Sequence, residues 1–291
     1  MPDSAAATRA RDLGQLLRSR RDRLSPTDAG LSEGTRRRTR GLRREEVAQL
    51  AAISPTYYAF LEQGREMRPS RQVLDALCVA LRLDPAERVY VHDLVHGEGR
   101  AKSAATPAAA EEILPALGAL VDRLDPSPAY VTGRTWDVLA ANRAARLLWT
   151  DWPARPPADR NMLWWMFADP AAPVVLPDWP REAAALLGRF RAASTRHPGD
   201  AAFTALRDRL LEHSEDVRKW WPRHDVAPLS SGSKRLYHPD LGELIFEHVV
   251  LQLVDNPDHR LVTFNAPDDV LEAIARRLGR PGLSKSGFSS P

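Results

Sequence analysis

Apolar residues recur with a helical period through the first part of the chain. Leu13, Leu16 and Leu17 share one face of residues 9–24, while six arginines lie among the other positions, as in an amphipathic helix. The same periodicity continues to residue 95. The predicted helices run over 9–24, 43–51, 54–64, 70–83 and 85–95. This succession predicts a small all-α bundle over residues 9–96.

The pattern changes after residue 110. A strongly periodic helix, 111–124, precedes two short apolar runs around Gly133 that read as strands. Further predicted helices follow, and then three strands in a meander. The later strands are predicted at 130–132, 136–140, 234–238, 243–254 and 260–265. Helices are predicted at 142–149, 178–196, from Asp200 onward, and 268–278, and residues 161–167 form a short apolar segment. Two strands, several helices and three strands predict an α+β domain with an antiparallel sheet, in the order of a PAS-like fold that encloses a small cavity.

Composition divides the chain in the same way. Its 291 residues suit two domains. We place the first at 9–96, a small-residue, proline-containing linker at 97–110, the second at 111–279, and a disordered tail at 280–291. The N-terminus lacks the apolar core of a signal peptide, no apolar run approaches the length of a membrane span, and one cysteine, Cys78, fits a reducing compartment. We therefore expect no membrane association and a cytoplasmic, nucleoid-associated protein.

The segment Leu42–Gly64 carries the most specific pattern. Ser54 suits an N-cap and Pro55 the first helical position, while Gly64 suits the helix end. Two short helices joined by a tight turn, with the second presenting its N-terminus, are typical of a DNA-reading helix-turn-helix. The alternative is a helical hairpin with no role in DNA binding.

Charge favours the first interpretation. Residues 9–44 contain 12 arginines and four acidic residues, a balance that suits a polyanionic partner such as double-stranded DNA. Four of these arginines lie in the loop after the first helix, which is either a solvated basic loop or an arm that tracks phosphates or a minor groove. The candidate DNA-binding residues are Arg36, Arg37, Arg38, Arg40, Arg43, Arg44, Ser54, Thr56, Tyr57 and Phe60. We expect Arg44 to meet a phosphate, and Thr56, Tyr57 and Phe60 to face the major groove.

Aromatic residues gather in the second half. All eight tryptophans lie between Trp136 and Trp221. They either line a cavity for an apolar ligand or simply fill a core. The candidate ligand-binding residues are Trp136, Asn142, Asn161, Trp164, Trp165, Phe167 and Phe246. His238, His248 and His259 match no metal-ligand spacing, so we expect neither a metal nor a cofactor.

Both halves resemble one known family. The run from Leu42, with LEQGRE and VLDALCVALRLDP after it, resembles the Xre/Cro-type helix-turn-helix, although Ala52 stands where that family usually has glycine. PAYVTGRTWDVLAANRAA, NMLWWMFADP and LPDWPREAAALLGRFR resemble the MmyB-like subgroup. The resemblance implies a homodimeric transcriptional regulator with a PAS-like ligand-binding domain and a fatty-acid-like ligand. Trp164 stands where we expect arginine in that subgroup, which suggests a less acidic ligand.

Other functional classes fit less well. The sequence has no phosphate loop and no Gly-x-Gly-x-x-Gly, so an enzyme fused to a DNA-binding domain has little support. An antitoxin would not need a large aromatic-rich second domain. A DNA-binding regulator whose second domain serves only dimerisation or protein partners stays open. The long apolar stripe of 111–124 either dimerises or packs on the sheet.

Overall fold

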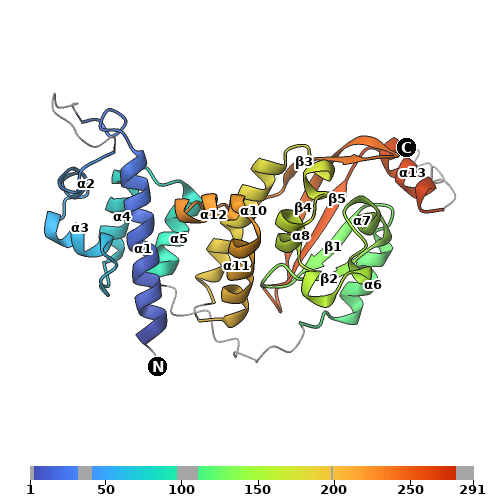
Figure 1. The fold of residues 1–291 in the computed structure, drawn as a ribbon, viewed down its shortest axis with the longest axis horizontal. Helices are drawn as coiled ribbons and strands as arrows, with labels where there is room; N and C mark the ends of the chain where they lie inside the picture. Colours follow the sequence, from blue (N-terminus) through green and yellow to red (C-terminus); the bar gives the residue numbers. More distant parts are fainter. Residues whose placement is uncertain (1–2, 32–40, 97–110, 198, 280–291) are drawn as a thin grey trace, which may run out of the picture. The chain divides into compact units, whose positions relative to one another are not determined.

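The computed structural model describes residues 3–31, 41–96, 111–197 and 199–279. The predicted arginine arm with Arg36, Arg37, Arg38 and Arg40, the linker 97–110 and the tail 280–291 lie outside the described residues. The chain divides into two compact units (Figure 1). We call residues 1–107 with 185–228 the helical unit, and residues 108–184 with 229–291 the sheet unit.

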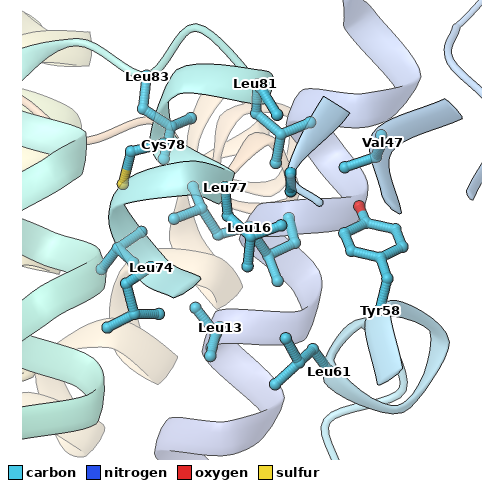
Figure 2. Close-up of a cluster of buried hydrophobic side chains, with 14 of the residues drawn as sticks. Leu13, Leu16, Val47, Tyr58, Leu61, Leu74, Leu77, Cys78, Leu81 and Leu83 are labelled. Atoms are coloured by element: carbon cyan, nitrogen blue, oxygen red, sulfur yellow. The ribbon is translucent and has the colours of Figure 1, made fainter. Parts of the chain in front are cut away.

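The first part of the helical unit confirms the predicted bundle. Its helices are α1 (Asp3–Arg23), α2 (Arg44–Leu50), α3 (Pro55–Glu62), α4 (Arg71–Ala80) and α5 (Pro85–His96). Figure 2 shows Leu13 and Leu16 of α1 beside Leu61 of α3 and Leu77 of α4. These side chains belong to one buried cluster, in which Leu16 and Leu77 are fully buried. Burying a leucine stabilises by roughly 1.5–3 kcal/mol, so this cluster is what holds the short helices in place.

The helical unit also contains a segment that the sequence-based division assigns to the second domain. The segment comprises the end of α10 (Trp179–Ser194), α11 (Ala201–His213), α12 (Glu215–Trp220) and the 3-10 helix η3 (Trp221–Arg223). Ala192 and Val226 pack against the buried cluster of the bundle. The boundary at 97–110 therefore does not separate the two compact units, because residues 185–228 pack with the N-terminal helices.

The sheet unit contains the predicted antiparallel sheet. Its strands are β1 (Ala129–Thr132), β2 (Val138–Ala141), β3 (Gly232–His238), β4 (Gly242–Gln252) and β5 (Arg260–Asn265). The strand order is β2-β1-β5-β4-β3, and every neighbouring pair is antiparallel. The first and last strands thus lie side by side, with Tyr130 opposite Val262. This arrangement confirms the α+β, PAS-like fold class.

Helices flank the sheet. They are α6 (Pro115–Arg123), α7 (Arg143–Leu148), η1 (Trp152–Ala154), η2 (Pro157–Asp159), α8 (Met162–Ala168), α9 (Ala172–Val175), the start of α10, and α13 (Asp268–Arg277). Helix α6 packs on β1 and β2, and Leu117 and Val121 contact the apolar cluster that contains Val131 and Leu261. Leu117 and Val121 of the predicted stripe therefore face the sheet, whereas Leu114 and Leu120 are exposed.

Some predicted boundaries were wrong. Helix α6 begins at Pro115, because proline is favoured at a first helical position, where its missing N–H costs nothing. Strand β2 begins at Val138, because Trp136 has a φ of +66° and cannot extend a strand. Helices α9 and α12 were not predicted. They are too short for a helical period to show.

Candidate DNA-binding interface and ligand-domain interior

The turn between α2 and α3 has the backbone geometry that a helix-turn-helix requires. Ala52 adopts a φ of +53°, in the left-handed region that glycine usually fills. The amide of Ile53 then donates to the carbonyl of Ala48 at 2.9 Å, which closes α2. Ser54 follows as N-cap, and its Oγ accepts from the Tyr57 amide at 3.1 Å. The left-handed backbone of Ala52 costs a small amount of conformational energy, and this turn positions the N-terminus of α3.

The predicted groove-facing residues differ in their surroundings. Thr56 is exposed on the first turn of α3. Tyr57 is half-buried and packs against the bundle core, so only part of its ring is accessible. Phe60 is also half-buried, and the Arg65 guanidinium lies 3.8 Å from the centre of its ring. The exposed face of α3 therefore presents a hydroxyl, part of a phenol, and an arginine stacked on an aromatic ring.

A buried carboxylate ties α3 to the two helices beside it. Glu62, with a side chain 1% exposed, accepts from Arg21 of α1 at 2.7 and 3.0 Å. It also accepts from Arg44 of α2 at 2.8 and 2.9 Å. Burial opposes ionisation of Glu62, but these hydrogen bonds outweigh it and lower the pKa of the carboxyl. We call Arg21, Glu62 and Arg44 the reading-helix lock, since it fixes α3 against α1 and α2.

The remaining arginine candidate is placed at the start of α2. Arg43 is exposed at the N-cap, and its backbone amide donates to Glu46 Oε2 at 2.6 Å. Arg44 belongs to the lock, yet 46% of its side chain is exposed. Both side chains therefore have surface beside the N-terminus of α2, where a phosphate is electrostatically favoured.

Sequence reasoning missed Arg21 and Arg65. The helical pattern put the arginines of 9–24 off the leucine face, whereas Arg20 is 9% exposed and the Arg21 side chain 11%. The signal for Arg20 was present, because it lies seven residues after Leu13 and so shares the apolar face of α1. Arg65 follows the helix-ending Gly64, and no sequence pattern marks its position over Phe60.

In the sheet unit, the side chains of the two candidate asparagines form hydrogen bonds with main-chain groups. Asn142 caps α7, accepting from the Ala145 amide at 2.9 Å and donating to Ser127 at 2.8 Å. Asn161 caps α8, accepting from the Trp164 amide at 3.0 Å and donating to the Thr135 carbonyl at 2.7 Å. Their hydrogen bonds thus hold the ends of two helices.

The candidate aromatic residues lie in separate groups. Phe246 meets Phe264 edge-on at 6.0 Å. Phe167 meets Trp179 at 6.1 Å, and Trp164 is half-buried on α8. Trp136 lies under the guanidinium of Arg260 at 4.4 Å. The structure therefore distributes the candidates through the interior of the sheet unit.

One pair in this interior has unsatisfied donors. Trp165 packs against Trp152 at 6.2 Å between ring centres. Both rings are buried, and neither indole Nε1 has an acceptor among the described residues. Trp165 is one of the ligand-binding residues predicted from the sequence, whereas Trp152 is not.

The three histidines take up separate positions. His248 contacts the Ser230 carbonyl at 3.1 Å, and the Asp240 amide donates to His238 Nδ1 at 3.2 Å. His259 is buried and faces Glu111 at 3.5 Å. Within the described ranges, no three His, Cys, Asp or Glu side chains are grouped to hold a metal ion.

Two families match the chain. The helix-turn-helix domain family matches residues 12–91, and the family described as MmyB-like transcription regulator ligand binding domain matches residues 113–278. No curated protein matches the chain. In the described part of the chain, no helix combines the length and apolar character needed to cross a membrane. The capped α3 beside its turn and the PAS-like sheet agree with both matches, and the chain belongs to the MmyB-like transcription regulators, with a DNA-binding helix-turn-helix followed by a ligand-binding domain.

Proposed function

We propose that the protein reads a specific operator through the first turn of α3, as a homodimer on two half-sites. The observation that carries this proposal is the exposed Thr56 next to the capped N-terminus of α3, held in place by the reading-helix lock. Half-sites would lie about 34 Å apart, one turn of DNA. Arg43, Arg44 and Arg65 would contact phosphates, which carry affinity without sequence information.

The test compares a residue expected to contact bases in the major groove with one expected to contact a DNA phosphate. Thr56→Ala should change the preferred bases, by about 1–3 kcal/mol at the contacted position, and leave the salt dependence unchanged. Arg43→Ala should weaken binding to all sequences alike and reduce the salt slope by about 1. Selection from a randomised duplex pool and fluorescence anisotropy at several salt concentrations measure both effects. Identical behaviour of the two variants would mean that α3 is not the reading helix.

We further propose that the ligand of the second domain is apolar with a small polar end, as a fatty-acid-like molecule is. Buried aromatic side chains in the sheet unit support an apolar ligand. The indole N–H groups of Trp152 and Trp165 support a ligand that carries a hydrogen-bond acceptor. Trp164 in place of arginine favours a less acidic polar end.

Extraction of the natively purified full-length chain tests this proposal by mass spectrometry. A stoichiometric apolar molecule is the expected result, and Trp164→Arg should shift the bound mixture towards carboxylic acids. An unchanged mixture would show that Trp164 does not determine how acidic the bound ligand is. An empty extract from a protein that still binds DNA would favour the alternative, a regulator whose aromatic residues only build a core.

A further inference from the structure

The helical unit contains a cavity of about 140 Å³ that the helix-turn-helix function does not use. Its lining comes from α1, α5, α10, α11 and η3, so the N-terminal bundle and the segment 185–228 both contribute. The lining residues that matter here are Arg9, Asp12, Arg191, Phe203, Trp221 and His224. All of them belong to the helical unit, so this cavity is separate from the interior of the sheet unit.

A buried cation forms one wall. Arg191 is 3% exposed; it donates to the Trp221 carbonyl and to His224 Nδ1, the latter at 3.1 Å, and its guanidinium stacks 3.8 Å from the Trp221 ring. Because arginine can only donate, His224 Nδ1 must accept, and His224 is neutral in this pair. The wall is therefore a fixed positive charge with no mobile proton.

An aromatic stack forms a second wall. Phe203 stacks on Phe190 at 5.3 Å and on the His197 ring at 5.2 Å, the latter with an interplanar angle of 14°. The stack gives the cavity an aromatic wall, against which a planar ligand ring can pack. A cavity of about 150 Å³ can accommodate benzene, so a cavity of this size fits a single ring.

Two charged side chains of α1 complete the lining. Arg9 and Asp12 are both half-buried. Neither has a hydrogen bond or an ion pair within 4 Å in the part of the chain that the structure describes. A ligand could therefore satisfy both, by offering an acceptor to Arg9 and a donor to Asp12. Arg207 adds a third arginine to the lining and also pairs with Asp208 at 2.7 Å.

We propose that this cavity binds a single-ring aromatic acid with a hydroxyl group. The ring lies against Phe203, the carboxylate meets Arg9 and Arg207, and the hydroxyl donates to Asp12. Such a ligand would bridge α1, which carries Arg21 of the reading-helix lock, to a segment that lies within the matched ligand-binding domain. It would thus stabilise the packing of residues 185–228 against the DNA-binding bundle.

Isothermal titration calorimetry of the full-length protein with three probes tests the chemistry. We expect 4-hydroxybenzoate to bind at least about ten-fold more tightly than benzoate, which lacks the donor, or phenol, which lacks the carboxylate; ten-fold corresponds to about 1.4 kcal/mol. Asp12→Ala should abolish the preference over benzoate, and Arg9→Gln the preference over phenol. Arg18→Gln, on an exposed part of α1 outside the lining, is the matched control and should bind as the parent protein does.

Each outcome bears on the proposal. Absence of saturable binding by 4-hydroxybenzoate would overturn it, as would equal affinities for the three probes. Binding that survives both Asp12→Ala and Arg9→Gln would place the ligand elsewhere and would also overturn it. Circular dichroism melting identifies a variant that has lost its fold, and the second variant then decides, since Arg9 and Asp12 report on opposite ends of the ligand.

Discussion

Two neighbouring arginines of α1 anchor two polar clusters that differ in how completely they are satisfied. Arg21 belongs to the reading-helix lock, where Glu62 is 1% exposed and accepts hydrogen bonds from Arg21 and Arg44. Arg20 points to the other side, where it binds Glu87 at 2.5 Å and the His224 carbonyl at 3.1 Å. One helix thus holds the DNA-reading elements with one residue and the segment 185–228 with the next.

The two clusters differ in whether charged side chains beside them lack hydrogen-bond partners. The lock consists of one buried carboxylate with two donors, an arrangement that suits a fixed geometry. The cluster beyond Arg20 is larger, since Arg23 binds Asp225 at 2.6 Å and Arg191 binds His224. It borders a cavity in which Arg9 and Asp12 have no hydrogen bond to the described residues. A saturated polar cluster fixes structure, and an incompletely satisfied one is suited to binding.

The largest expected effect comes from opening the lock. Glu62→Ala removes the buried carboxylate that Arg21 and Arg44 share and leaves Arg21 with only the exposed Asp22 as an anionic partner, which should cost about 3 kcal/mol of unfolding free energy. Urea denaturation followed by circular dichroism measures the loss in the helical transition. Glu66→Ala, at an exposed position, is the control and should change stability by less than about 0.5 kcal/mol. A similar small change for both variants would contradict the lock.

The second effect is a pH dependence that separates the clusters. Burial, with help from Arg191, lowers the pKa of His224 to about 4. The unfolded chain gains this proton near pH 6.5 and the folded protein only near 4, so stability should fall between these values, by about 3 kcal/mol. Glu62 has a lowered pKa, so its stabilisation is lost only below the unfolded carboxyl value of about 4.3.

His224→Asn is the informative variant for this prediction. Asparagine tolerates the left-handed backbone of His224, whose φ is +54°, and its amide oxygen can accept from Arg191. Denaturation curves at pH 7 and pH 5 should differ less for this variant than for the parent protein. An unchanged difference would assign the pH dependence to another group.

Sequence patterns predict the elements of this protein better than its contacts. The helical period of the leucines in α1 and the signals around Ser54 were sufficient for the helix-turn-helix, because these features depend on neighbouring residues. Ala52 shows the limit, since its positive φ follows from the tight turn and not from its own preference.

Contacts between segments that are distant along the chain could not be predicted from sequence patterns. No local pattern tells that Arg20 meets the carbonyl of His224, more than two hundred residues away. The same holds for the packing of residues 185–228 with the N-terminal helices, which no composition change marks. The cavity with Arg9 and Asp12 depends on that packing, and so it was not among the candidate sites.

The smallest effect tests whether the lock also contacts DNA. Arg44→Ala removes one of the two donors to Glu62, but its side chain is 46% exposed, so the stability loss should be only about 0.5–1 kcal/mol. If Arg44 also meets a phosphate, the slope of log affinity against log salt should fall by about 1. Anisotropy measured between low and moderate salt gives the slope, and Arg43→Ala provides the matched exposed arginine. A lower stability with an unchanged slope would leave Arg44 as a structural residue of the lock, and the clusters would then differ only in their openness to small ligands.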